Sequence, residues 1–391
     1  MTISAGNRPM AAEALPLRDF TVPPPGIPGA PNDVDLGITG RCNLSCRYCF
    51  YADSMKEKHD IPLQAWQAIL AELGDLAVQR VCLSGGEVFL RDDLFAIIDS
   101  VIGNKMRYSI LTNGTLLTEK VIKKFDTGKR RLRLDSIQVS IDGSKAEIHD
   151  LSRPPKSFDR AVHGLRLLVD AKFPATVRVT LNRHNIDDLE GIARLLIDDI
   201  GLSGFSTNEA EPMGTARCHG GNIVLTHEQR RSAMKTLAEL SERYGNRISA
   251  NAGPLAMAEM VAELDRLRAA GETRQAGRGT LCSCGGVFSK MAILHDGTMV
   301  PCNLLPTLVM GVAGMHSVKE AWLHSPAINS VRYRYEVPIT AIPTCSGCTY
   351  TGFCTGGCPA IVMAEKGRLL GIDPLSCYRY LKKEVGYDEL L

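Results

Sequence analysis

The 391-residue sequence lacks the features of a membrane, secreted or nucleic-acid-binding protein. No apolar run approaches the roughly 20 residues that a helix needs to span a bilayer. The N-terminus has no basic region followed by an apolar core, as a secretory signal would. Because 45 Lys and Arg nearly balance 43 Asp and Glu, the formal charge is only +2, which gives no electrostatic basis for binding nucleic acid or an acidic membrane. We therefore expect a cytoplasmic protein with neither kind of partner.

The composition is that of a globular protein, with 45% hydrophobic and 23% charged residues, and no internal repeat is evident. The length is too great for one ordinary domain and suits two. Residues 1–31 are rich in Pro and Ala, which predicts a flexible, Pro-rich N-terminal arm.

Cysteine is abundant, with 13 in the chain. In a protein without a secretory signal, metal binding in a reducing cytoplasm is a better interpretation than disulfide bonding. Eleven of the cysteines fall into an N-terminal group of three and a C-terminal group of eight.

The N-terminal group, Cys42, Cys46 and Cys49, directly follows a strand-like run at 34–39. A [4Fe–4S] cluster normally takes four thiolates. Three thiolates would leave one iron without a protein ligand, so that a small molecule could chelate it. The spacing therefore predicts a reactive cluster rather than a structural one.

Between about 32 and 225, short apolar strands alternate with amphipathic helices. The predicted strands are 34–39, 80–84, 107–112, 136–141, 176–182 and 204–207. Six strand–helix units predict a parallel sheet and a partial (β/α)6 TIM-like barrel, with its active site at the carboxyl ends of the strands. We expect a helical bridge at 226–276, with Thr226 capping its first helix, and a small, cysteine-rich α+β domain at 277–391.

Polar residues and glycines gather where the predicted strands end. The second strand is followed by Ser84, Gly85, Gly86 and Glu87, the third by Asn113, and the fourth by Ser140 and its neighbours. Paired glycines let a backbone approach a ligand closely, and a carboxylate accepts from a cationic amine. Each motif alone is weak evidence for a ligand site. Because the motifs follow successive strands of one sheet, together they indicate one shared site.

The spacing of the first three cysteines, with Tyr48 before the last of them, resembles the radical S-adenosylmethionine (SAM) superfamily, and the run at 85–87 resembles its Gly-Gly-Glu motif. The resemblance implies a reducing [4Fe–4S] cluster on Cys42, Cys46 and Cys49, with the amine and carboxylate of SAM chelating the fourth iron. It further implies SAM contacts from Glu87 to the amine, from Ser140 and Arg153 on the carboxylate side, from Tyr48 at the adenine edge, and from Asn113 and Asn182 at the ribose.

The C-terminal cysteines resemble the SPASM extension, through Cys284-x12-Gly297-x4-Cys302, Cys345-x2-Cys348-x5-Cys354-x3-Cys358 and a final Cys377. The resemblance implies two more [4Fe–4S] clusters, hence three in all. An inner auxiliary cluster, nearer to SAM, would be held by Cys282, Cys284, Cys302 and Cys358. An outer auxiliary cluster would be held by Cys345, Cys348, Cys354 and Cys377. The tight Cys282-x-Cys284 spacing leaves open whether both of these cysteines are ligands.

Other interpretations of single features remain. Paired cysteines such as those at 345–358 also bind zinc, although the N-terminal group argues against zinc here. Cys82 is expected to be a small core residue within a strand, and Cys218 to lie near the active-site mouth. The basic run at 129–133 is expected to be a solvated loop or a docking site for an acidic flavodoxin or ferredoxin.

The resemblance covers roughly 32–385 and is greatest to maturases of ribosomally made peptides (RiPPs). It implies hydrogen abstraction from a peptide, giving a crosslink, an oxidation or an epimerisation, with flavodoxin or ferredoxin as the low-potential electron donor. Two features of the sequence distinguish it from particular groups of maturases. Sulfatase maturases typically carry an aspartate where this chain has Asn303, and a carboxamide cannot accept a proton, which weakens that interpretation. Some 31 residues precede the barrel, too few for a leader-binding domain, so a separate leader-binding protein is one expectation.

Two alternatives stay open. The first is a radical SAM dehydrogenase, epimerase or decarboxylase that acts on a small molecule such as a sugar, an aminocyclitol or a nucleoside. The second is a non-catalytic iron–sulfur or zinc scaffold, which would not form 5′-deoxyadenosine from SAM.

Overall fold

The computed structural model describes residues 19–55, 59–219 and 222–390. Most of the expected arm at 1–31 lies outside these residues. Its described part, 19–31, is anchored to the C-terminal helix α12 (Val318–His324), where Trp322 Nε1 donates to Pro28 O at 2.8 Å. The described part of the expected arm therefore contacts the C-terminal part of the chain.

The centre of the fold is the parallel sheet that the sequence predicts. Its six strands pair in chain order: β1 (Asp33–Thr39), β2 (Arg80–Gly85), β3 (Arg107–Thr112), β4 (Leu134–Ser140), β5 (Ala175–Leu181) and β6 (Phe205–Glu209). Alternating residues, such as Val34, Leu36 and Ile38, are fully buried and share one hydrophobic core with the helices. The residues between them point to the opposite, concave side.

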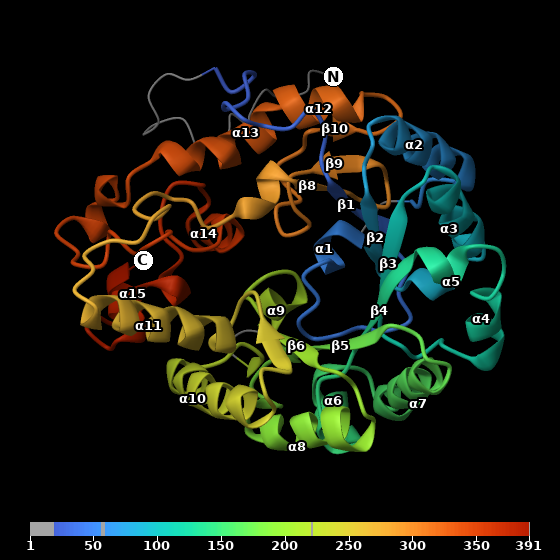
Figure 1. Cartoon of the computed structure of the whole chain (residues 1–391), viewed down its shortest axis with the longest axis horizontal. Coiled ribbons are helices and arrows are strands. Elements are labelled where there is room, and N and C mark those ends of the chain that lie inside the picture. Colours follow the sequence, from blue (N-terminus) through green and yellow to red (C-terminus); the bar gives the residue numbers. More distant parts are fainter. Residues whose placement is uncertain (1–18, 56–58, 220–221, 391) are drawn as a thin grey trace.

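Helices surround the sheet and return the chain from one strand to the next (Figure 1). They are α2 (Leu63–Asp75), α3 (Leu94–Gly103), α4 (Glu119–Lys124), α5 (Arg130–Arg133), α6 (Ala146–Ser152), α7 (Ser157–Asp170) and α8 (Leu189–Ala193), which continues as a π-helical turn at Arg194–Asp199. Strand and helix alternate as predicted, and the result is the partial barrel.

The sheet extends beyond the six predicted strands at both edges. β7 (Ile248–Ala250) pairs with β6, while β8 (Lys290–Ile293) pairs in parallel with β1 and is followed by β9 (Thr298–Val300) and β10 (Gly311–Val312). These strands are two to four residues long, too short for a periodic pattern to reveal. The cysteine-rich part thus begins as a continuation of the barrel sheet.

Two long helices occupy the expected bridge, α10 (His227–Arg243) and α11 (Pro254–Ala269). Thr226 caps α10 as predicted, in a capping box with Gln229. The rest of the chain has only short helices, including α13 (Pro326–Arg332), α14 (Pro359–Lys366) and α15 (Tyr378–Leu381). None of the helices in the described ranges is long and apolar enough to cross a bilayer.

Candidate active site and cluster sites

The loop that carries the first three cysteines leaves the carboxyl end of β1 and is fastened to the loop after β2. Gly86 N donates to Thr39 O and Glu87 N donates to Arg41 O, both at 2.8 Å. A Cβ atom at Gly85 would lie 2.3 Å from Thr39 O, and one at Gly86 would lie 2.1 Å from Arg41 O. The paired glycines therefore allow close approach to the cysteine loop itself.

The other side of the cysteine loop is held by the segment after β6. There, at the start of α9 (Thr215–Cys218), Thr215 N donates to Cys49 O at 3.1 Å and its hydroxyl donates to Cys46 O at 2.9 Å. The segments that follow β2 and β6 thus both fix the loop.

The three thiols of this loop form one group. Burial raises the pKa of each thiol, that of Cys49 to about 11, and the charges of Cys46 and Cys42 also act on Cys49. Leu44 N donates to Cys42 Sγ at 3.5 Å. Because buried thiols with a raised pKa ionise only when a cation compensates them, this donor set fits a metal cluster.

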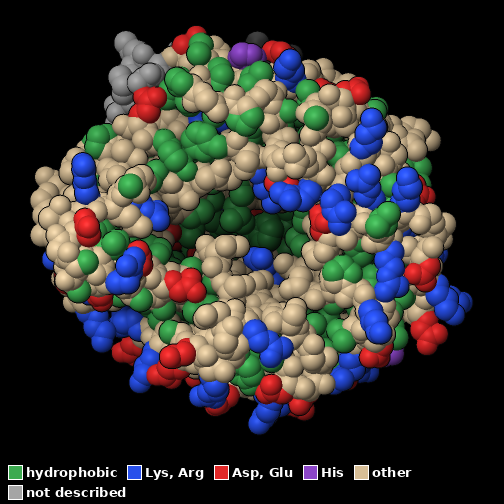
Figure 2. Space-filling view, viewed as in Figure 1, with side chains coloured by type: hydrophobic (Ala, Val, Ile, Leu, Met, Phe, Trp, Pro, Cys, Tyr) green, Lys and Arg blue, Asp and Glu red, His purple; other side chains and the backbone are tan. Residues whose placement is uncertain are grey.

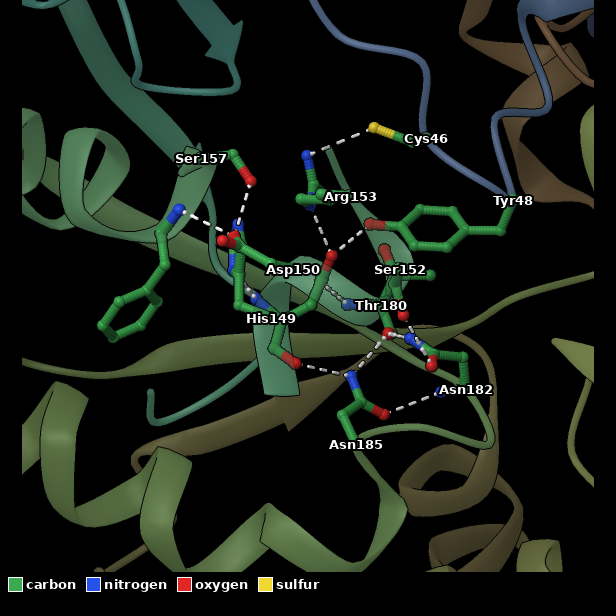
Figure 3. A network of polar contacts seen from close by, with 12 residues as sticks. Cys46, Tyr48, His149, Asp150, Ser152, Arg153, Ser157, Thr180, Asn182 and Asn185 are labelled. Atoms are coloured by element: carbon green, nitrogen blue, oxygen red, sulfur yellow. Dashed lines mark hydrogen bonds and ion pairs between the residues drawn. The ribbon is translucent and has the colours of Figure 1, made fainter. Parts of the chain in front are cut away.

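A buried polar network stands beside Cys46 (Figure 3). Asp142, which follows β4, accepts from the Tyr48 hydroxyl and from Arg153 Nε at 2.5 Å, and its other oxygen accepts from Thr180 N at 2.8 Å. Arg153 Nη1 donates to Cys46 Sγ at 3.8 Å, and its guanidinium lies 5.5 Å from the centre of the Tyr48 ring. The network joins the cysteine loop to β4 and β5.

Two of the predicted SAM contacts are thereby already engaged within the protein. Tyr48 is tied to Asp142 through its hydroxyl, and desolvation raises its pKa. Arg153 commits Nε to the same carboxylate. The sequence analysis noted the motif around Ser140 but did not single out Asp142, because its partner Tyr48 lies 94 residues earlier in the chain.

Asn182, expected near the ribose, lies at the edge of this network (Figure 3). Its Oδ1 accepts from Ser152 Oγ at 2.9 Å and from His184 N at 3.0 Å, and the side chain is fully buried. Nearby, His149 Nδ1 accepts from Asp142 N at 3.0 Å, and burial lowers the pKa of His149 to about 4. Asn182 and His149 therefore stabilise the network through these hydrogen bonds.

Glu87 and Asn113 come together as the sequence predicts. The fully buried carboxylate of Glu87 accepts from the Thr112 hydroxyl at 2.7 Å and from Asn113 N at 2.8 Å, and burial raises its pKa. Asn113 Nδ2 donates in turn to Asn43 Oδ1 at 2.9 Å, within the cysteine loop. The carboxylate is thus oriented at the carboxyl ends of β2 and β3.

The two predicted serines differ in their surroundings. Ser84 Oγ donates to Leu36 O at 3.4 Å, across to β1. Ser140 ends β4, half-buried, in register with Arg178 of β5. Both belong to the set of residues that points to the concave side of the sheet.

Three cysteines of the C-terminal part form a second group. Burial raises the pKa of Cys302 to about 12 and that of Cys358 to about 11, and Cys284 acts on both thiols. Leu304 N donates to Cys302 Sγ at 3.4 Å. Cys282 differs from these three, because its thiol donates to Gly277 O at 3.1 Å.

The remaining four cysteines line a single cavity. Cys345, Cys348, Cys354 and Cys377 all border it. Burial raises the pKa of Cys354 to about 12, with the other three thiols contributing. In the described part of the chain, no group of three or more His, Cys, Asp or Glu side chains is arranged to hold a single metal ion. Four thiols around a common cavity fit a cluster whose irons each take one thiolate.

One face of the molecule has a depression near its centre (Figure 2). Figure 2 shows a deep depression in the middle of one face, and in the same view of Figure 1 the elements around it are α1 (Ala52–Met55), α9 and α14. α1 begins three residues after Cys49, and α14 directly follows Cys358. The depression is thus bordered by the helix that follows the cysteine loop of the barrel and by the helix that follows Cys358 (Figure 1 and Figure 2).

These arrangements agree with comparisons to known protein families. Residues 36–196 match the model of the radical SAM superfamily, and residues 282–349 match SPASM, an iron–sulfur cluster-binding domain. The chain therefore contains a radical SAM domain followed by a SPASM domain. Members of this family are enzymes; the first domain binds a [4Fe–4S] cluster and SAM, and the second binds additional iron–sulfur clusters.

Individual relatives differ in their described activities. The chain is 26% identical over 361 residues to an AdoMet-dependent heme synthase of Methanosarcina barkeri, covering 90% of this chain and 98% of the relative. It is 25% identical to the PqqA peptide cyclase of Rhizobium meliloti, covering 88% and 85%. In fold it resembles Streptococcus suis SuiB bound to its precursor peptide SuiA, with a TM-score of 0.66, 16% identity and coverage of 87% and 74%.

Proposed function

We propose that this chain cleaves SAM reductively at a [4Fe–4S] cluster held by Cys42, Cys46 and Cys49, and abstracts hydrogen from a peptide. The observation that carries the proposal is the group of three partly buried thiols on one loop at the carboxyl end of β1, which the segments after β2 and β6 fix. When bound, the cluster and SAM supply a 5′-deoxyadenosyl radical, which removes hydrogen from an unactivated C–H bond.

The residues around the loop would position SAM. We assign Glu87 to the methionine amine, since Thr112 and Asn113 orient its carboxylate. We assign Ser140 and the guanidinium nitrogens of Arg153 not used by Asp142 to the carboxylate side, Tyr48 to the adenine edge, and the side chains of Asn113 and Asn182 to the ribose. Burial of these groups excludes water from the site, which protects a radical from side reactions.

The C-terminal cysteines would hold two auxiliary clusters. We assign Cys345, Cys348, Cys354 and Cys377 to the outer cluster, and Cys284, Cys302 and Cys358, with Cys282 as the fourth ligand, to the inner one. Burial within the domain keeps these sites from solvent. The inner cluster would receive the electron that is left when the product is more oxidised than the substrate.

A peptide is the substrate class that the comparisons favour. One relative is named for cyclising a peptide, and a protein of the same fold is described with its precursor peptide bound. The depression bordered by α1, α9 and α14 would offer a peptide room to reach the radical (Figure 1 and Figure 2). Flavodoxin or ferredoxin is the proposed electron donor, and a separate leader-binding protein is a proposed partner.

A small molecule is the second candidate substrate. The similarity to the AdoMet-dependent heme synthase favours this candidate, because the match covers 98% of that relative. A sugar, an aminocyclitol or a nucleoside would fall in the same class of non-peptide substrates.

One experiment separates the candidates. The protein is reconstituted anaerobically with iron and sulfide and incubated with SAM, a reductant and the peptides encoded beside its gene, in deuterated buffer. Deuterium in a product would indicate epimerisation, and a loss of two mass units would indicate a crosslink or a dehydrogenation. The peptide proposal would be overturned if every peptide stayed unchanged while the enzyme converted a small molecule from a pathway encoded by neighbouring genes.

A further inference from the structure

We propose that Arg334 is the buried counter-charge of the inner auxiliary cluster and raises the reduction potential of that cluster. The inference rests on the proposed assignment of Cys284 and Cys358 to this cluster. It concerns the chain's own electrostatics and does not depend on which substrate the enzyme takes.

Arg334 is buried with few partners of its own. It lies in the 3-10 turn Tyr333–Glu336 and is 1% exposed. Its Nη2 donates to Gly371 O at a long 3.5 Å, and its Nε is buried without a hydrogen-bond partner. None of the ion pairs among the described residues includes it. An uncompensated buried charge costs several kcal/mol, so this guanidinium requires an anion that the side chains alone do not supply.

The neighbouring groups show where that anion would be. The contacts of this turn place Arg334 between the segments that carry Cys284 and Cys358. The ring of Tyr335 lies 4.5 Å from that of Phe288, four residues after Cys284. Arg334 itself donates to Gly371 O, two residues before Asp373, whose carboxylate accepts from Cys358 N. The negative charges of Cys358 and Cys284 accordingly act on Arg334. Asp373 is already used by other donors, among them the backbone of Cys358 at 3.3 Å and the Ser376 hydroxyl at 2.9 Å.

The sulfurs of Cys284 and Cys358 would supply this anion. Bound to a cluster, they are thiolates. A guanidinium group is charged at neutral pH. The guanidinium therefore gains its counter-charge when the cluster binds.

Arg332 provides a natural comparison two residues earlier. It is equally buried, and desolvation lowers the pKa of both arginines to about 10. Its partners, however, are Val287 O at 2.9 Å, Trp322 O at 2.6 Å and the Asn329 amide oxygen at 2.9 Å, and no cysteine charge acts on it. The Nη2 of Arg332 is also buried without a partner. Arg332 nevertheless makes three hydrogen bonds of 2.6–2.9 Å to the protein, whereas Arg334 makes one long hydrogen bond.

The consequence is a shift in redox potential. Reduction adds one negative charge to the cluster, and a fixed positive charge nearby stabilises the reduced form more than the oxidised form. Net charge around a cluster is one of the factors that set its potential. Arg334 would therefore make the inner cluster a better electron acceptor than an otherwise identical neutral site.

The test is a potentiometric titration followed by electron paramagnetic resonance. It uses the reconstituted full chain with Cys42, Cys46 and Cys49 changed to Ala, so that only the auxiliary clusters titrate. Arg334→Met should lower the reduced-to-oxidised ratio of one cluster at least tenfold at a fixed applied potential, which is 59 mV for a one-electron couple. Arg334→Lys should restore most of the shift, and Arg332→Met should leave both potentials unchanged.

Each outcome is decisive. Two unchanged potentials in Arg334→Met, or an equal shift in Arg332→Met, would overturn the inference. If Arg334→Met loses about four irons per chain while Arg332→Met keeps all of them, the counter-charge role is supported, because the cluster then depends on that charge for binding. Loss of iron from both variants would contradict it. If the starting protein forms no inner cluster at all, it is the proposed ligand assignment that fails.

Discussion

Gly214 lies directly against the carbonyl oxygen of Cys49, and a Cβ atom on Gly214 would come within 2.1 Å of that oxygen. The same residue has a positive φ of 54°. The tight turn after β6 is thus what lets this segment close over the cysteine loop. The contact joins the last predicted strand of the barrel to the third predicted ligand of the SAM cluster.

Gly214→Ala should therefore reduce cluster binding at the cysteine loop. The added methyl group must push the loop away from β6, because backbone cannot overlap at 2.1 Å. We expect the reconstituted variant to lose about four irons per chain and to cleave SAM poorly. Gly245→Ala is the matched control, since Gly245 has a φ of 61° with nothing within 4 Å of the added carbon. Equal iron content in the two variants would contradict this account.

Asp142→Asn should destabilise the protein strongly. It leaves Arg153 buried beside Cys46 without its carboxylate partner, and breaking a buried ion pair typically costs about 3–5 kcal/mol. Chemical denaturation measures the loss. Arg243→Gln, which breaks an exposed pair with Glu190, should cost less than about 1 kcal/mol. A loss for Asp142→Asn as small as that of the control would show that the network does not hold the loop.

His149 should make stability depend on pH below neutrality. Burial lowers its pKa to about 4, from 6.5 in the unfolded chain. The unfolded state therefore binds more protons in this window, so stability is complete above pH 6.5 and falls as the pH drops toward 4. The full loss is about 3 kcal/mol.

His149→Asn is designed to keep an acceptor for Asp142 N but cannot titrate, so its free energy of unfolding should change less between pH 7.5 and pH 5. The comparison uses metal-free, reduced protein of both forms, so that acid loss of clusters does not contribute. Parallel pH profiles for the two proteins would rule out His149 as the titrating group.

Cys348→Ser and Cys218→Ser should differ in iron content. Cys348 borders the cavity that it shares with three other thiols, whereas Cys218 is exposed on α9. Full reconstitution corresponds to about 12 irons per chain for three [4Fe–4S] clusters. We expect Cys348→Ser to fall toward about 8 and Cys218→Ser to remain at the wild-type value. A full complement in Cys348→Ser would remove that residue from the ligand set.

The sequence predicted those parts of the fold that depend on local periodicity. The six central strands are five to seven residues long with alternating burial, and each begins or ends within two residues of its predicted boundary. Strands β7 to β10 were missed because their stability comes from pairing with neighbours already in the sheet. The anchoring of residues 19–31 was missed for a similar reason, because Trp322 lies 294 residues from its partner Pro28.

The site residues also divide into those that local sequence predicts and those that depend on long-range contacts. Spacing within one loop was enough to group Cys42, Cys46 and Cys49, because they are close in sequence. Asp142, within the motif after the fourth strand, was not singled out, because Tyr48, from which it accepts, lies 94 residues earlier in the chain. Contacts of this kind arise only when the barrel has closed, and no spacing in the sequence encodes them.

The account is tested most directly by whether the first three cysteines make this chain cleave SAM. Full-length protein, reconstituted without oxygen, is given SAM and a strong reductant, and 5′-deoxyadenosine is measured by chromatography beside a Cys46→Ala variant. We predict 5′-deoxyadenosine from the native chain and background levels from the variant. No 5′-deoxyadenosine from native protein that carries its full iron content would contradict the central claim.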